Sequence, residues 1–176
     1  AKEMRERVLA LLEHEEILHT EISLKTVPYI ATFHALGVRI IKENAHLLGI
    51  TRHFTIFDRQ DSIRAIKEAT RVAGFDPKEF EPRKLLSAIS KQKGNAVSVR
   101  DFEEGVEGGK EHYSLSHSRL VSSVWREYQR ILNKEKALDF DDLPLKAYEL
   151  LRDTPDVRKK YLDMLKYVHI DEYQDT

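Results

Sequence analysis

Hydrophobic residues recur every three or four positions along most of this chain, with charged residues between them. The apolar stripes start near Met4, Phe33, Ile63 and Leu85, and a further stripe runs through Trp125. This spacing puts the apolar side chains of each stripe on one face of an amphipathic helix. The pattern therefore predicts a mainly helical protein with Trp125 in its core.

Several residues predict where these helices begin and end. Asp58, with a second aspartate three residues later, resembles a capping box that opens a helix ending at Gly74. Pro82 suits the first turn of the next helix, because proline lacks the backbone N–H that is unpaired there. Residues 95–109 are expected to be mostly loop, with one short helix near Phe102. The middle of the chain is therefore expected to be a group of short helices.

Two short apolar runs, residues 27–31 and 167–170, interrupt the helical pattern. A run this short and this apolar is typical of a buried strand in a parallel sheet. In open α/β sheets, ligands bind just beyond the carboxyl ends of such strands. The sequence therefore predicts an α/β fold and directs attention to the residues that follow each run.

Two adjacent carboxylates, Asp171 and Glu172, follow the second run. In nucleotide hydrolysis, one carboxylate can hold Mg²⁺ while the other orients and deprotonates the attacking water. A solvated acidic turn is the simpler interpretation. Gln174 and Asp175 favour a hydrolytic site, because this density of hydrogen-bonding groups exceeds what a solvated turn requires.

Thr32, Phe33 and His34 follow the first run and open the next helix. A helix start offers unpaired backbone N–H groups and the positive end of the helix dipole, and both suit a phosphate. Thr32 and His34 would add side-chain donors. Spacing alone also allows Thr32 to be a simple N-cap and His34 to be packed in the core.

A further acidic cluster, residues 139–142, precedes another apolar stripe. Asp139 is expected to cap the helix that carries this stripe, and the other aspartates would interact favourably with the positive end of its dipole. A metal site is the alternative, although acidic residues in a first helical turn need no further explanation.

The composition narrows the class of protein. The 176 residues are 41% hydrophobic and 34% charged, which is typical of a folded, charge-rich protein. The absence of cysteine excludes disulfides and thiolate metal sites. No apolar run approaches the roughly 18 residues of a membrane span, and no signal peptide is present, so no membrane partner is expected. The formal net charge of −1 gives no basic signal for the chain as a whole.

Charge is nevertheless uneven in the middle of the chain. No acidic residue occurs between Glu81 and Asp101, or between Glu111 and Glu127. Such stretches are often solvated helix faces, but together they would form a positive surface for duplex phosphates. The candidate duplex contacts are Arg83, Lys84, Lys91, Lys93 and Arg119.

Four segments resemble, in order, segments of the superfamily 1 DNA helicases of the UvrD/PcrA/Rep type. Residues 170–176, Ile-Asp-Glu-Tyr-Gln-Asp-Thr, are similar to motif II, the Walker B box, of this family. Residues 32–34 resemble motif Ib, residues 1–8 resemble the helix after motif Ia, and residues 138–143 resemble its Leu-Asp-Phe-Asp-Asp-Leu box. The resemblance covers essentially the whole chain.

The resemblance implies a partial RecA-like (P-loop NTPase) core that is interrupted by a mainly helical subdomain. Residues 1–48 and 140–176 would belong to core subdomain 1A, and residues 49–139 to helical subdomain 1B. The implied function is that of a fragment of an ATP-dependent 3′–5′ DNA helicase. Such an enzyme couples ATP hydrolysis to translocation on single-stranded DNA and to duplex unwinding, with a role in DNA repair or replication in the bacterial cytoplasm.

The same resemblance implies roles for individual residues. Asp171 would hold Mg²⁺, Glu172 would be the catalytic base, and Gln174 and Asp175 would support the ATP site. Thr32, Phe33 and His34 would contact single-stranded DNA. The implied cofactors are ATP and Mg²⁺. The implied partners are single-stranded DNA, junctions of single- and double-stranded DNA, and the remaining helicase domains.

The chain also departs from the family pattern. No Gly-x-x-x-x-Gly-Lys-Ser/Thr sequence occurs, so the phosphate-binding loop of motif I is missing. The second RecA-like domain is missing too, and we expect both ends to be cuts in a longer protein. The chain alone is therefore expected neither to bind ATP usefully nor to unwind DNA.

Three other functions stay open at this stage. The first is a non-catalytic DNA-binding module in which the acidic box is inert. The second is the helicase part of a recombination helicase–nuclease. The third is a metal-dependent nuclease or phosphatase, which would require residues 139–142 and 171–175 to converge on two metal ions about 4 Å apart.

Overall fold

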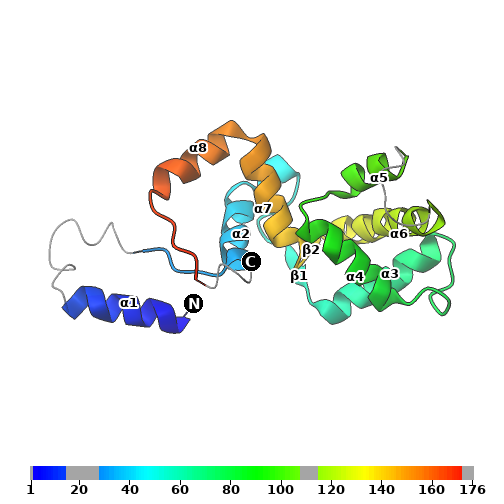
Figure 1. Ribbon diagram of the computed structural model, residues 1–176, viewed down its shortest axis with the longest axis horizontal. Helices are drawn as coiled ribbons and strands as arrows, with labels where there is room; N and C mark the ends of the chain where they lie inside the picture. The colour runs from blue at the N-terminus through cyan, green and yellow to red at the C-terminus, as the bar shows by residue number, and fades with distance from the viewer. Residues whose placement is uncertain (1, 15–27, 108–114, 172–176) are drawn as a thin grey trace.

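The computed structural model describes residues 2–14, 28–107 and 115–171 and shows a mainly helical α/β protein with a small parallel sheet (Figure 1). The α/β class and the helical character predicted from the sequence are confirmed. The elements, in chain order, are α1 (Lys2–His14), α2 (Phe33–Glu43), the 3-10 helix η3 (Ala45–Leu48), β1 (Thr55–Phe57), α3 (Arg59–Val72), α4 (Pro82–Gly94), α5 (Val99–Glu107), α6 (Leu115–Lys134), β2 (Ala137–Asp139), α7 (Asp142–Asp153) and α8 (Pro155–Met164).

Local side-chain chemistry sets helix boundaries as the sequence predicts. Asp58 Oδ1 accepts a hydrogen bond from the Asp61 backbone N–H at 2.8 Å, and Asp61 Oδ2 accepts one from the Asp58 N–H at 3.2 Å. This capping box starts α3. Pro82 lies in the first turn of α4, and the short helix expected near Phe102 is α5. These predictions are confirmed, but α5 is nine residues long, so the expectation that residues 95–109 are mostly loop is wrong.

The sheet consists of β1 and β2, and the sequence pattern predicts neither strand. They pair in parallel, with Ile56 opposite Leu138 and Phe57 opposite Asp139. Helices α3 to α6 lie between them in the chain, since a tight turn cannot join two parallel strands. β2 is buried throughout, whereas β1 is partly exposed. Strands of three residues are too short to show the alternation by which strands are recognised in a sequence.

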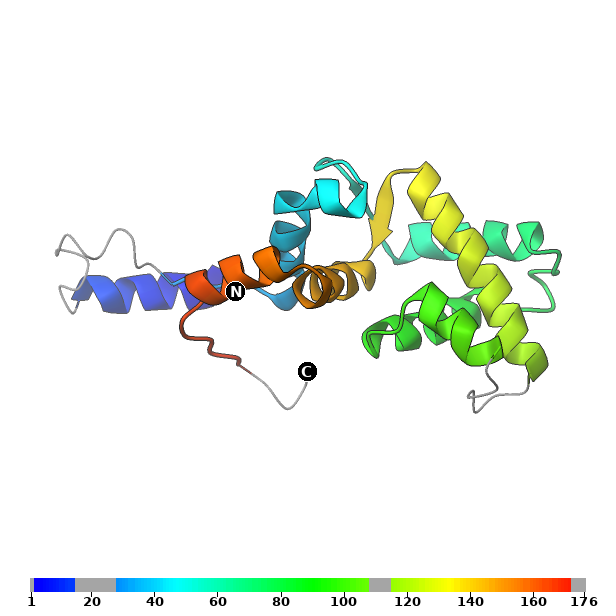
Figure 2. The same cartoon turned by 90° about the horizontal axis from the view of Figure 1, so that it is seen from above.

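Two hydrophobic cores lie on either side of this sheet (Figures 1 and 2). The first, which we call the α3–α6 core, is built by helices α3, α4, α5 and α6 around Ile66 and Ile89. The second, which we call the α2/α7/α8 core, includes Ile41, Leu143 and Tyr161. The chain passes from the second core to the first through β1 and returns through β2.

Trp125 lies inside the α3–α6 core. Only 1% of its surface is exposed, and its ring packs against Phe102 with the ring centroids 5.6 Å apart. The helix that carries it, α6, is 20 residues long. The prediction of a core tryptophan is confirmed, and Trp125 is therefore not accessible for stacking on a nucleic-acid base.

The two strands predicted from the apolar runs do not form in the described residues. Residues 28–31 are irregular, and residue 27 lies outside the described part of the chain. Residues 167–170 are unpaired and exposed, with Tyr167 at 87% and Val168 at 67%. A parallel strand needs a neighbouring strand, and the pairing within the described residues is that of β1 with β2. The predicted buried strand at residues 167–170 is therefore wrong for this structure.

Candidate functional site

The start of α2 presents Thr32 and Phe33 to solvent. Thr32 is the N-cap in an extended conformation (φ −75°, ψ 159°), and its Oγ1 accepts a hydrogen bond from the Ala35 N–H at 3.2 Å. The simple N-cap interpretation of Thr32 is therefore confirmed. A hydroxyl that accepts in this way keeps its own proton, which it can donate outward. Phe33 is 48% exposed, so both side chains are accessible to a ligand.

His34 packs against a residue that is distant in the sequence. Its half-buried ring stacks on Phe140, with the ring centroids 3.8 Å apart and the ring planes 20° from parallel. Phe140 follows β2 and is still 57% exposed. We call these two rings the His34–Phe140 platform. The exposed surface of Phe140 is available for stacking.

Close packing of α2 on α7 supports this platform. Gly37 is buried in α2, and a Cβ atom there would lie 2.8 Å from the carbonyl oxygen of Leu143. No side chain fits at that distance, so glycine allows the backbone of α2 to touch the start of α7. Gly37 lies three residues after His34, on the same face of the helix. The contact that requires glycine therefore also brings His34 to Phe140.

Two aspartates close the turn that carries Phe140. The Asp142 N–H donates to Asp139 Oδ1 at 2.8 Å, and the Asp139 N–H donates to Asp142 Oδ2 at 3.2 Å. This reciprocal arrangement resembles a capping box. The N-cap of α7 is Asp141, so the prediction that Asp139 is the N-cap is wrong, although the Asp139 side chain accepts the N–H of Asp142 at the start of the helix. Both aspartates are buried, with 2% and 1% of their surfaces exposed.

Lys93, at the end of α4, forms ion pairs with both of these carboxylates. Its Nζ lies 2.7 Å from Asp139 Oδ2 and 2.8 Å from Asp142 Oδ1, and only 1% of its side chain is exposed. The Tyr128 hydroxyl donates to the same Asp139 Oδ2 at 2.9 Å. We call Lys93, Tyr128, Asp139 and Asp142 the buried ionic cluster. The cluster ties α4 and α6 of one core to the start of α7 in the other.

Burial and charge compete within this cluster. Burial alone would lower the pKa of Lys93, but the carboxylates of Asp142 and Asp139 outweigh it, so the pKa of Lys93 is raised. Burial raises the pKa of Asp142, and the opposing effect of the Lys93 ammonium does not cancel that shift. Burial, reinforced by Asp139, also raises the pKa of Tyr128. The lysine therefore stays charged and the tyrosine stays protonated.

The prediction that Lys93 contacts duplex DNA is wrong, because its ammonium is buried and paired. A signal for this burial exists in the sequence. Lys93 lies four residues after Ile89 and seven after Leu86, so it occupies the next position of the apolar stripe of α4. The other candidate duplex contacts are all exposed, and they are Arg83, Lys84, Lys91 and Arg119.

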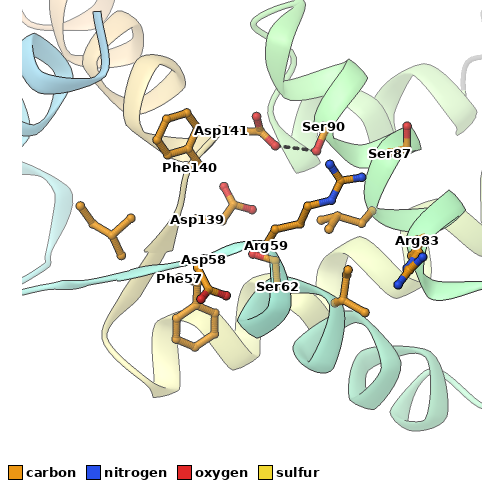
Figure 3. Close-up of a pocket in the computed structure, with 13 residues that line it drawn as sticks. Phe57, Asp58, Arg59, Ser62, Arg83, Ser87, Ser90, Asp139, Phe140 and Asp141 are labelled. Atoms are coloured by element: carbon orange, nitrogen blue, oxygen red, sulfur yellow. Dashed lines mark hydrogen bonds between the residues drawn. The ribbon is translucent and has the colours of Figure 1, made fainter. Parts of the chain in front are cut away.

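An open pocket of about 590 Å³ lies beside the platform, between β1, the start of α3, α4 and the turn after β2. Phe140 and Arg83 lie at opposite ends of this pocket, with Arg59 between them (Figure 3). On its wall, the Ser90 hydroxyl donates a hydrogen bond to Asp141 Oδ2 at 2.5 Å. The pocket thus connects the platform to one candidate duplex contact.

The acidic box at the end of the chain is described only in part. Asp171 is exposed in a turn. Glu172, Gln174 and Asp175 lie outside the described residues, so their roles stay predictions. Among the residues that the structure describes, no group of three or more His, Asp or Glu side chains is arranged to hold a metal ion. In the other acidic cluster, the buried carboxylates face Lys93 instead of a shared metal position.

Comparison with known proteins decides the family. The family model of the UvrD/REP helicase N-terminal domain matches residues 1–176. The chain belongs to the UvrD/REP helicase family. The resemblance read from the sequence motifs is thereby confirmed.

Relatives of this UvrD/REP helicase domain support the same family. The ATP-dependent DNA helicase PcrA of Staphylococcus aureus (strain Mu50) is 36% identical over 177 residues. The ATP-dependent DNA helicase PcrA of Staphylococcus epidermidis (strain ATCC 12228) is 36% identical over 176 residues. Each comparison covers 100% of this chain and 22% of the relative. The chain therefore spans about a fifth of the length of these curated relatives.

The UvrD/REP helicase domain brings together side chains that suit nucleic acid. Hydroxyl and imidazole donors, partly exposed aromatic rings and exposed basic residues are the groups that bind single strands and phosphates. The sequence analysis did not identify Phe140 as a site residue, because no local pattern indicates that its ring stacks on one as distant in the chain as His34. In the described part of the chain, no helix combines the length and the apolar character that crossing a membrane requires.

Proposed function

We propose that this chain is the part of an ATP-dependent DNA helicase that grips single-stranded DNA and supplies the acidic residues of the ATP site. The observation that carries the proposal is the match along the whole chain to relatives named ATP-dependent DNA helicase. The complete protein would couple ATP hydrolysis to 3′–5′ translocation and duplex unwinding, in DNA repair or replication. ATP and Mg²⁺ would be its cofactors.

Single-stranded DNA would bind at the start of α2. The Thr32 hydroxyl has a proton to donate, and the first turn of a helix directs N–H groups and a positive dipole end toward a phosphate. His34 would add an imidazole donor. The exposed rings of Phe33 and Phe140 suit sequence-independent stacking on bases.

Asp171 would hold Mg²⁺, and Glu172 would act as the base that deprotonates the attacking water, with Gln174 and Asp175 supporting the site. Carboxylate oxygens are ligands that Mg²⁺ prefers, and this cation commonly binds one or two carboxylates together with phosphate oxygens. The residue types therefore fit the cofactor. Bound Mg²⁺ would neutralise charge that develops on the transferred phosphate.

We further propose that residues 1–48 and 140–176 belong to a RecA-like core and that residues 49–139 form an inserted helical subdomain. The presence of two hydrophobic cores, with the chain crossing between them at β1 and β2, supports this division. In the complete protein, further core elements would pack against the exposed residues 167–170. The exposed apolar side chains of α1, such as Leu11 at 64%, would gain a surface to cover.

The duplex ahead of the single strand would contact the helical subdomain. Arg83 lines the pocket that leads from the platform, and Lys84 and Lys91 lie seven residues apart, on one face of α4. Arg119 would contribute from α6. Their exposed ammonium and guanidinium groups would neutralise phosphates, a contribution that weakens as the salt concentration rises. Lys93 is not part of this surface.

The experiment that tests the proposed function measures DNA-stimulated ATP hydrolysis by the intact protein that contains this chain. Glu172→Gln should lower turnover by about 10²- to 10⁴-fold, because a general base is lost, while binding of single-stranded DNA is retained. Glu68→Gln, at an exposed position of α3, is the matched control and should not change turnover. The 176-residue chain by itself should not hydrolyse ATP, because it has no phosphate-binding loop.

Unchanged turnover in the Glu172→Gln protein would refute the assigned catalytic base. A protein that binds single-stranded DNA but shows no DNA-stimulated ATP hydrolysis at all would favour the non-catalytic DNA-binding module instead.

A further inference from the structure

We propose that Lys93 is a positioning residue for DNA binding: by forming ion pairs with both Asp139 and Asp142, it fixes the turn that carries Phe140 and so holds the His34–Phe140 platform in shape. This inference rests on the proposed function, in which His34 contacts single-stranded DNA. Lys93 is buried, so it acts through the turn and not by touching DNA.

The turn depends on a positive charge at its centre. Asp139 and Asp142 are almost fully buried, and each accepts a hydrogen bond from the backbone N–H of the other. Lys93 lies within 2.8 Å of both carboxylates. Without it, two buried carboxylates would face each other with no cation, which is strongly unfavourable. They would take up protons or move toward water, and either change disturbs the reciprocal hydrogen bonds that close the turn.

The position of Phe140 depends on that turn. Phe140 lies between the two aspartates in sequence and is 57% exposed, so tight core packing does not hold its ring. Its backbone carbonyl accepts a hydrogen bond from the Leu143 N–H at 3.4 Å, and its ring stacks on His34. A change in the turn therefore shifts the Phe140 ring directly, and His34 loses the surface on which it rests.

The cation comes from the other core. Lys93 lies in the last turn of α4, and Tyr128, which donates to the same Asp139 oxygen, lies in α6. Both helices belong to the α3–α6 core, whereas His34 belongs to α2. The shape of the DNA-contacting platform is therefore linked to the placement of the helical core. A displacement of α4 away from α7 would therefore change the position of Phe140 and with it the stacking of His34.

The test compares the intact protein with its Lys93→Met variant, which keeps most of the length of the side chain and removes its charge. Lys67→Met, at an exposed position of α3, is the matched control. The histidines are labelled with ¹³C, and the His34 ring signal is assigned as the one that disappears in His34→Gln. A proton held against an aromatic ring 3.8 Å away carries a ring-current shift, and Phe140→Leu shows the position of the signal without that ring.

We expect Lys93→Met to move the His34 signal toward its position in Phe140→Leu, while Lys67→Met leaves it in place. Affinity for a single-stranded oligonucleotide should fall by roughly three- to tenfold in Lys93→Met. The double variant Lys93→Met, Phe140→Leu should bind no more weakly than Phe140→Leu alone, because both changes act through the same stack. A residue that served stability only would lower the melting temperature without this signal shift or this non-additivity.

A folded Lys93→Met protein with an unchanged His34 signal would overturn the proposal. Where Lys93→Met does not give folded protein, Asp142→Asn decides, since it removes the ion pair between Lys93 and Asp142. A shifted His34 signal in that variant supports the proposal, and an unshifted one overturns it. The ring signal is measured without DNA, so a His34→Gln protein with undiminished DNA affinity would count against the proposed function alone.

Discussion

Replacing Gly37 by alanine should weaken the contact between α2 and α7 that underlies the His34–Phe140 platform. The added Cβ atom would lie 2.8 Å from the carbonyl oxygen of Leu143 and 3.1 Å from its carbonyl carbon. Both are backbone atoms, so neither can rotate away as a flexible side chain would. The two helices must separate by roughly 0.6 Å before the contact reaches the 3.4 Å of ordinary van der Waals packing.

Two opposing effects set the size of the change. Overpacking a well-packed core typically costs about 1–3 kcal/mol. Alanine in a helix is favoured over glycine by about 0.8–1.0 kcal/mol, which offsets part of that cost. We therefore expect Gly37→Ala to lower the free energy of unfolding by about 0–2 kcal/mol, or the melting temperature by up to ~8 °C.

Urea unfolding followed by circular dichroism measures this difference, and Gly94→Ala is the matched control. Gly94 is also helical, but a Cβ atom there meets nothing within 4 Å. Only the helix preference operates at that site, so Gly94→Ala should raise the free energy of unfolding by up to about 1 kcal/mol. A Gly37→Ala protein that gains as much stability as the Gly94→Ala protein would refute the argument from close packing.

Two further predictions concern stability. Hydrogen bonds from Lys160 and Arg39 lower the pKa of Glu43 from its ordinary value of 4.5 to about 2, so the carboxylate stabilises the fold above pH 4.5 and this stabilisation is lost as the pH falls through about 2. Glu43→Gln should therefore reduce the free energy of unfolding by about 0.5–1 kcal/mol at pH 7, which is the modest value of a partly exposed ion pair. The difference in urea midpoint between the unmodified protein and the variant should become smaller as the pH decreases. A difference that does not depend on pH would contradict this prediction. Ala96 has a left-handed backbone (φ 58°), so Ala96→Gly should raise the free energy of unfolding by about 0.5–1 kcal/mol and with it the melting temperature. Ala73 has an ordinary helical backbone (φ −71°), so Ala73→Gly should lower the melting temperature. Equal effects at the two alanines would refute the strain argument.

The sequence predicts the local features of this fold because local chemistry determines them. The capping box at Asp58, the proline in the first turn of α4 and the buried Trp125 all depend on residues close in the chain or on helical periodicity. Whether a short apolar run becomes a strand depends instead on whether a neighbour pairs with it. The run at residues 167–170 is therefore exposed in this structure, while β1 and β2 form although no alternation marks them.

The candidate site divides in the same way. The motif at residues 32–34 identifies the start of α2 as a phosphate-binding candidate, and the N-cap role of Thr32 follows from its position. The stacking of His34 on Phe140 joins segments far apart in the chain, so no local pattern reveals it. For Lys93, residue type misleads. A lysine in a stretch without acidic residues is expected to be exposed to solvent, yet Lys93 is buried and its counter-ions are carboxylates of β2 and α7.

The parallel pairing of β1 with β2 limits how the helical region can be exchanged between proteins. Because both strands run in the same direction, the chain leaves one at the opposite end from where it joins the other. A tight turn cannot replace the region; a crossover of a dozen or more residues is needed. Grafting between homologues is therefore best done at the boundaries after Phe57 and before Ala137, which keep both strands whole. A compatible grafted region must also supply a buried cation in the place of Lys93, because Asp139 and Asp142 stay in the recipient.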